Sequence, residues 1–146
     1  MTEWPAFIKE HFTKDVEFIR FMGIDVMETA HGYAKISIHV EQMHANTYGV
    51  THGGVCAALV DAASGICLRT LKHKIVTVET TTVYYAPASI GDTLYATAKL
   101  ANQGKKLLHA EVEITNQDDK RIAGGKTIYF IIGEDDGIYR QNQKAF

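Results

Sequence analysis

The sequence predicts an α+β fold in which a curved antiparallel β-sheet wraps around one long central helix. Residues 53–71 form an almost wholly apolar segment with helical character. Four segments of strand-like composition follow, joined by short polar turns, which is typical of an antiparallel sheet. Strands of about 8 to 11 residues extend roughly 27 to 37 Å, and the helix about 28 Å. One face of the sheet can therefore cover the helix along its length.

Composition indicates a soluble globular chain. Its 146 residues are 46% hydrophobic and 22% charged, and its net charge of −2 gives no electrostatic reason to expect a nucleic acid or an anionic membrane as partner. The apolar segment is too short and too rich in Ala and Gly to span a bilayer, and it contains Asp61. The N-terminus lacks the layout of a signal peptide, so we expect a cytoplasmic location.

Before the apolar segment, the chain predicts one helix and two strands. Residues 2–22 form an amphipathic helix with Pro5 in its first turn and Gly23 as its stop signal. Residues 24–28 and 33–40 are strands, and 41–51 is a polar loop. In the second strand the inward-facing residues alternate with polar ones: Ala34, Ile36, Ile38 and Val40.

After the apolar segment, four strands are expected, and then a polar tail from residue 134. They are residues 74–85, 93–101, 107–115 and 121–132. Gly124 and Gly125 inside the last strand indicate either a bulge or a close backbone approach. We expect one domain over residues 1–146, with the N-terminal helix at about 3–22, the core at 23–132 and the tail at 133–146.

Asp61 is the residue that most needs explaining. Between residues 53 and 68 it is the one formal charge, and a carboxylate in an apolar setting is costly unless it is paired or hydrogen-bonded. A structural carboxylate that caps nearby backbone is one interpretation, and a functional group is the other.

Cys56 and Cys67 lie about 16 Å apart along the same helix, too far for a disulfide. Cys56, in the first helical turn, is a weaker alternative nucleophile.

The segment before this helix carries a resemblance to a known family. The pattern Asn46-x-x-Gly49-x-x-His52-Gly53-Gly54, with Asp61 following, resembles the signature of PaaI-like (phenylacetate-pathway) acyl-CoA thioesterases of the hotdog fold. The match extends over roughly residues 20–132 and includes segments 76–79, 84–88, 91–92, 103–105 and 123–125. It implies a hotdog fold, a homodimer or a homotetramer built as a dimer of dimers, and a hydrolase for acyl-CoA. Coenzyme A would enter as part of the substrate, so no cofactor is expected.

The resemblance also implies roles for single residues. Asp61 would be the nucleophile or the general base, and the backbone N–H of Gly53 would polarise the thioester carbonyl. Asn46 would orient the water or the carbonyl, and Thr77 would lie near the attacking water. For His52, bracing the helix start and positioning the substrate are equally compatible interpretations. By default Asn46 is a turn residue and Thr77 a strand former.

Helix geometry places a strong constraint on such a site. The first N–H groups of a helix are unpaired and suit a developing oxyanion, and glycines at 53 and 54 let a bulky substrate approach them. Gly53 and Asp61 are nevertheless separated by about 12 Å along the axis. Two antiparallel helices across a two-fold axis would bring Gly53 of one chain beside Asp61 of the other. We therefore predict a site shared across a dimer interface.

Other features leave alternatives open. Lys105 and Lys106 belong either to a solvated turn or to a subsite for the CoA phosphates. The seven histidines show no paired spacing, so we expect no metal site. A hotdog hydratase or dehydratase is one rival, although its typical His-Phe-Pro-Gly-like segment is lacking, and a non-catalytic acyl-CoA sensor is another. The acyl group is not determined. Five aromatic residues could line its pocket or belong to the core: Phe18, Phe21, Tyr48, Tyr84 and Tyr85.

Overall fold

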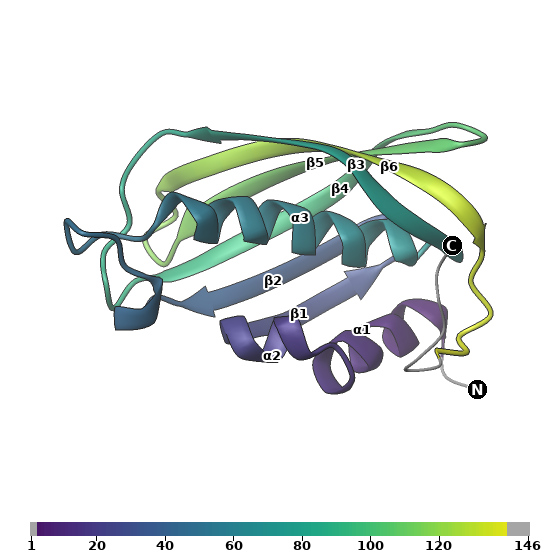
Figure 1. Ribbon diagram of the computed structural model, residues 1–146, viewed down its shortest axis with the longest axis horizontal. Coiled ribbons are helices and arrows are strands. Elements are labelled where there is room, and N and C mark those ends of the chain that lie inside the picture. The colour runs from purple at the N-terminus through teal and green to yellow at the C-terminus, as the bar shows by residue number, and fades with distance from the viewer. Residues whose placement is uncertain (1–2, 140–146) are drawn as a thin grey trace.

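A six-stranded antiparallel sheet curves around a central helix in the computed structural model, which describes residues 3–139 (Figure 1). The strand order is β1-β2-β4-β5-β6-β3, so β3 forms a free edge. This arrangement confirms the predicted hotdog fold. The elements are α1 (Trp4–Lys14), α2 (Glu17–Met22), β1 (Ile24–Ala30), β2 (Tyr33–His39), η1 (Gln42–His44), α3 (Gly53–Arg69), β3 (His73–Tyr84), β4 (Thr93–Gln103), β5 (Leu107–Asn116) and β6 (Arg121–Glu134).

The hydrophobic core lies between α3 and the inner face of the sheet. Strand residues alternate between buried and accessible positions, as a half-covered sheet requires. The predicted alternation is therefore confirmed. The sheet's main contributions to the core are Ala34, Ile36, Ile38, Leu94, Ala96, Ala98, Leu108, Ala110 and Ile114.

The apolar composition of α3 predicts a helix that is buried on all sides. In the structure, α3 is covered on one side only. Its buried side chains include Leu59, Val60 and Ala63, and they face the sheet. The opposite stripe is only half-buried or exposed, because no described element lies over it. This open face of α3 consists of Gly54, Ala57, Ala58, Asp61, Ala62 and Gly65.

The N-terminal region forms two helices where the sequence indicated one. The chain leaves helical geometry at Val16, which is extended at φ −100° and ψ 103° and begins α2. Val16 is β-branched and packs on the core in this conformation. Both helices lie along β1 (Figure 1), with Ile8 and Ile19 buried beneath them. The break lets the chain turn at Gly23 straight into β1.

The loop predicted over residues 41–51 contains local structure that the sequence did not indicate. It holds the short 3-10 helix η1, whose His44 is buried. The His44 side chain accepts a hydrogen bond from the Glu41 N–H at 2.9 Å and contacts the Met22 carbonyl at 2.9 Å. These bonds fasten the loop to the end of α2.

Gly124 and Gly125 mark a close backbone approach and not a bulge. Strand β6 keeps its register with β3 and β5 through both residues. A Cβ on Gly125 would lie 2.5 Å from the Thr81 carbonyl oxygen and 2.6 Å from a methyl group of Val60. Only glycine fits at this point of β6, where the strand pairs with β3 and packs against α3.

The predicted polar tail is fixed to the body over its described part, residues 134–139. Asp135 is buried and accepts a 2.8 Å hydrogen bond from the Arg69 guanidinium and another of 2.8 Å from the Tyr139 hydroxyl. Arg69 also lies over the Phe12 ring, 5.2 Å from its centroid. The end of α3, α1 and the tail thus meet in one cluster. The rest of the predicted tail, 140–146, lies outside the described residues.

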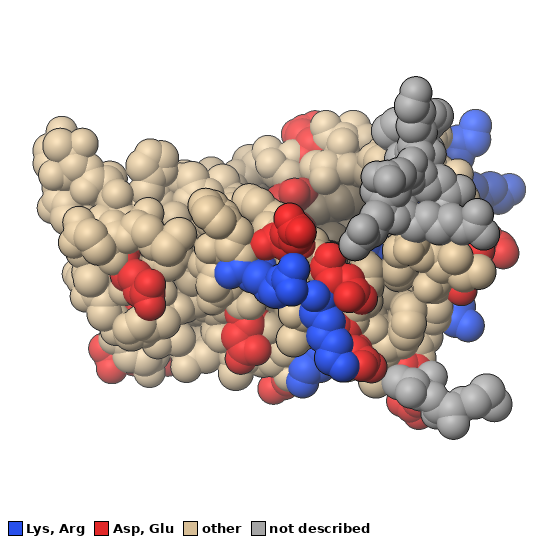
Figure 2. All heavy atoms as spheres, turned by 60° about the horizontal axis from the view of Figure 1, so that its bottom comes forward, with Lys and Arg blue, Asp and Glu red and all other residues tan. Residues whose placement is uncertain are grey.

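Charges of both signs lie on the face that carries α1 and α2. Figure 2 shows basic and acidic side chains intermixed over the middle of that face. Within residues 3–139, no helix has the length and apolar character needed to cross a membrane.

The close approach at Gly125 generates a stability prediction. Gly125→Ala should lower the free energy of unfolding by about 2 kcal/mol or more, because the added methyl overpacks β6 against β3 and α3. Gly133→Ala in the same strand is the matched control, since a Cβ there meets no atom within 4 Å. Urea unfolding of both variants measures the difference. Equal midpoints would show that the two backbones are not in tight contact at Gly125.

Candidate functional site

Asp61 lies at the middle of the open face of α3 and is held by two hydroxyl groups. The Thr77 hydroxyl donates to Asp61 Oδ1 at 3.0 Å, and the Tyr129 hydroxyl donates to the same oxygen at 2.5 Å. Tyr129 also reaches the Asp61 backbone carbonyl at 2.8 Å. Among the described residues, no Lys, Arg or His forms a salt bridge with this carboxylate. Neutral donors, and not a cation, therefore stabilise Asp61 on its apolar helix.

A β-bulge in β3 directs two side chains toward α3. Thr77 pairs with Tyr129 and Glu79 pairs with Ile128, so Val78 has no partner on β6. Side chains alternate along a strand, and one extra residue reverses that alternation. Thr77 before the bulge and Tyr84 after it consequently face α3 together. Without the bulge, residues 77 and 84 would point to opposite faces of the sheet.

The N-terminus of α3 presents a free backbone donor. The Gly54 N–H donates to His52 Nδ1 at 2.9 Å, so His52 caps the helix. A Cβ on Gly54 would lie 3.0 Å from that nitrogen, which ties glycine at 54 to the cap. The Gly53 N–H meets no acceptor within residues 3–139, and Gly53 is exposed. Tyr84 donates to the Gly53 carbonyl at 2.5 Å and braces this first turn.

Asn46 stabilises the loop that leads into α3. Its Oδ1 accepts the N–H groups of Tyr48 at 2.9 Å and Val50 at 3.3 Å. The Asn46 N–H in turn donates to the Val50 carbonyl at 2.7 Å. The loop then pairs Ala45 with Thr51, immediately before the capping residue. In one chain, Asn46 therefore acts as a turn residue that fixes the approach to Gly53.

Within one chain the predicted site residues form three separate groups. Asp61 and Thr77 lie together, whereas Gly53 is about 12 Å away along α3. The start of α3 lies near the start of β4, since the Thr51 N–H donates to Ala88 at 2.8 Å. Lys105 and Lys106 are exposed in the turn after β4, a strand about 35 Å long. They consequently lie toward the other end of the molecule (Figure 1).

A small apolar hollow of about 300 Å³ lies beside Gly53. Tyr84 and Tyr85 line it and are 52% and 51% exposed, so neither belongs to the core. The other three aromatic candidates are likewise exposed and do not line this hollow: Phe18, Phe21 and Tyr48. The remaining lining residues are Val50, Thr51, Cys56, Ala86, Pro87, Ala88 and Ile122.

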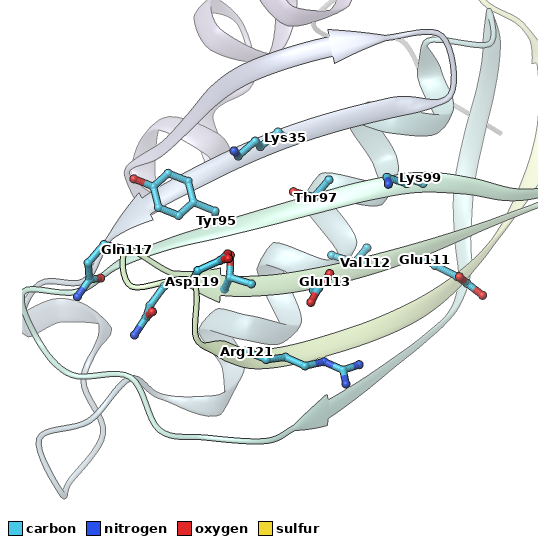
Figure 3. A pocket seen from close by; sticks show the side chains of 12 residues that line it. Lys35, Tyr95, Thr97, Lys99, Glu111, Val112, Glu113, Gln117, Asp119 and Arg121 are labelled. Atoms are coloured by element: carbon cyan, nitrogen blue, oxygen red, sulfur yellow. The ribbon is translucent and has the colours of Figure 1, made fainter.

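A larger hollow of about 890 Å³ lies on the other side of the sheet. Figure 3 shows its side chains projecting from the strands away from α3, with Lys35 and Lys99 intermixed with Glu111 and Glu113. The sheet separates this hollow from Asp61. It contributes nothing to the Asp61 site.

Cys56 is chemically unsuited to the nucleophile role. Burial raises the pKa of the Cys56 thiol to about 11, and that of Cys67 to about 12. At neutral pH both thiols are protonated, whereas the thiolate is the reactive form. They serve as small apolar core residues.

Sequence reasoning missed Tyr129, and it named Tyr84 only as a residue of the pocket or the core, without its contact with Gly53. Tyr129 is the inward residue of β6 opposite Thr77, and it became identifiable only when the register between β3 and β6 was known. Tyr84 faces α3 because of the bulge at Val78, and no residue preference marks that position in advance.

The family model and a human relative that match this chain are both thioesterases. Residues 48–123 match the family model described as the Thioesterase superfamily. Human acyl-coenzyme A thioesterase 13 is 33% identical over 130 residues, which cover 86% of this chain and 93% of that protein.

Two solved structures have the same fold. The E. coli PaaI protein from the phenylacetic acid degradation operon superposes with a TM-score of 0.86 at 26% identity, covering 92% of this chain and 99% of that one. A Streptococcus mutans protein bound to acetyl CoA gives a TM-score of 0.77 at 25% identity, with 80% and 94% covered.

The burial of the thiols generates a prediction of reactivity. At pH 8, iodoacetamide should alkylate Cys56 in the folded protein about a hundredfold more slowly than in urea. The thiolate fraction falls by that factor when the pKa rises from 9.0 to about 11. Mass spectrometry of timed samples measures the rates. Comparable rates in the folded and unfolded states would show that the thiol is accessible and ionisable.

Proposed function

The chain belongs to the thioesterase superfamily, and from this premise we propose that it hydrolyses an acyl-CoA thioester to a free acid and coenzyme A. The observation that carries the proposal is Asp61, a carboxylate on an open helix face with no cation beside it among the described residues. The relatives named as acyl-CoA thioesterases and the relative bound to acetyl CoA support the substrate class.

Thioester hydrolysis needs a group that polarises the carbonyl and a group that delivers the nucleophile. The Gly53 N–H, at the positive end of the α3 dipole, suits the carbonyl oxygen. Asp61 suits the second task. As general base it removes a proton from water, the hydroxide adds to the carbonyl carbon, and the C–S bond breaks to release the CoA thiolate, which takes up the proton.

Direct attack is the second route to the same products. An Asp61 oxygen adds to the carbonyl carbon and expels the CoA thiolate, leaving a mixed anhydride. Water then cleaves the anhydride, which releases the acid and restores the carboxylate, and the thiolate takes the remaining proton. Single turnover in ¹⁸O-labelled water separates the routes, because only attack by Asp61 can place the label in its own carboxylate.

We infer that two chains complete each site. Gly53 and Asp61 of one chain are too far apart to act on one carbon, and the open face of α3 is lined by small residues that allow another helix to approach. Beside it, β3 is a free edge whose Val78 is 57% exposed. Pairing β3 with its copy about a two-fold axis would lay the α3 helices antiparallel and create two equal sites. Association of two such dimers into a tetramer would leave these two sites unchanged.

The same arrangement gives the remaining predicted residues a place. With antiparallel helices, the turn that carries Lys105 and Lys106 lies toward the partner's α3 N-terminus. The two ammonium groups can then meet the CoA phosphates. The small apolar hollow beside Gly53 is the candidate site for the acyl group. Thiol-release assays with short, medium, long and aryl acyl-CoAs would identify that group.

Asp61→Asn tests the proposed chemistry. The amide keeps the shape of the side chain but is neither an adequate base nor a nucleophile, so kcat/KM should fall by about 10²-fold or more. Release of free thiol from acyl-CoA is the measurement. Asp25→Asn, an exposed carboxylate on β1, is the matched control and should retain the wild-type rate.

Two results would count against this mechanism. A full hydrolytic rate in Asp61→Asn would remove Asp61 from the chemistry. Wild-type protein that binds acyl-CoA but releases no thiol would instead favour the non-catalytic sensor.

A further inference from the structure

The two oxygens of the Asp61 carboxylate have different environments. Oδ1 accepts hydrogen bonds from both Thr77 and Tyr129. Oδ2 receives no hydrogen bond from any residue between 3 and 139. The carboxylate is therefore fixed through one oxygen, and the other remains available to a water molecule or a carbonyl carbon.

Tyr129 contributes the more rigid of the two contacts. It is 4% exposed and comes from β6 beneath the helix, whereas Thr77 lies on the exposed edge strand. Its hydroxyl also reaches the Asp61 backbone carbonyl at 2.8 Å, so side chain and main chain are fixed to one point.

The hydroxyl stays protonated at all working pH values. Burial, together with the neighbouring Asp61 carboxylate, raises the pKa of the Tyr129 phenol. Tyr129 therefore acts as a permanent donor. A lysine or arginine at this place would add a full positive charge and weaken the carboxylate as base or nucleophile, whereas a neutral hydroxyl orients it at a smaller cost.

We propose that Tyr129 is a positioning residue that holds Asp61 through Oδ1, so that Oδ2 is the oxygen that reacts. The proposal rests on the proposed function, because it assigns Tyr129 a task only if Asp61 performs the chemistry. Thr77 assists as a second donor to the same oxygen.

Tyr129→Phe removes the hydroxyl and keeps the ring. The kcat should fall about 10- to 100-fold with little change in KM, because the misplaced carboxylate affects the reacting step and not substrate binding. A purely structural tyrosine would change the thermal midpoint without this separation of kcat from KM. Tyr33→Phe, whose hydroxyl contacts Glu28 at 3.3 Å, is the matched control.

If the phenylalanine variant does not fold, a second replacement that retains the hydroxyl can be used in its place. Incorporation of 3-fluorotyrosine at position 129 retains the contact with a stronger donor, which withdraws negative charge from the Asp61 carboxylate, so kcat should change while KM and the thermal midpoint stay at their wild-type values. A change in kcat without a change in KM in either replacement supports the proposal, and a wild-type kcat in both overturns it.

The outcome also separates this inference from the proposed function. If Asp61→Asn abolishes thiol release while Tyr129→Phe keeps the wild-type kcat, the function stands and the role of Tyr129 is wrong. If Asp61→Asn retains the rate, the proposed mechanism itself is overturned. In the double variant, Tyr129→Phe should cause no loss beyond that of Asp61→Asn, because Tyr129 acts only through Asp61.

Discussion

A long apolar helix wrapped by a single sheet is covered on only part of its circumference. In this protein the uncovered part is the open face of α3, and Asp61 lies at its middle beside the free edge of β3. The small residues of that face and the exposed edge both favour contact with a second copy. Asp61 thus lies near a surface that a second chain can cover. Two hydroxyl groups hold its carboxylate, and no cation among the described residues pairs with it. The proposed chemistry depends on this arrangement.

The bulge at Val78 connects the two ends of the site. Because it reverses the alternation of β3, one strand supplies Thr77 to Asp61 and Tyr84 to Gly53. The strand thereby braces both the carboxylate and the first turn of the helix. Gly125 of β6, where a Cβ would collide with the Thr81 carbonyl of β3 and with Val60 of α3, lets β6 and its neighbour β3 lie close to the helix. A local irregularity and a glycine contact therefore fix the geometry on which the proposed chemistry depends.

Much of the fold could be predicted because its signals are periodic. The alternation of Ala34, Ile36 and Ile38 and the apolar run of α3 each define an element without reference to the rest of the chain. The sequence also singled out Asp61, because a lone charge in an apolar segment is a local anomaly. The break at Val16, the bulge at Val78 and the contact of Tyr129 were not predicted, because each depends on pairing between distant segments. The ion pair of Arg69 with Asp135 was not predicted for the same reason, because the two residues lie far apart in the sequence.

The central claim is that Gly53 of one chain acts with Asp61 of another, and subunit complementation tests it most directly. Gly53→Pro removes the N–H at the first helical position, where proline is tolerated, and His52 already has the extended conformation (φ −59°, ψ 137°) that precedes proline. Alone, Gly53→Pro and Asp61→Asn should each be inactive. When the two are unfolded together and refolded at equal concentration, half of the dimers are mixed, and each mixed dimer has one intact site. We expect recovery of about a quarter of the wild-type thiol-release activity. No recovery, with mixed dimers demonstrated by mass spectrometry, would contradict it.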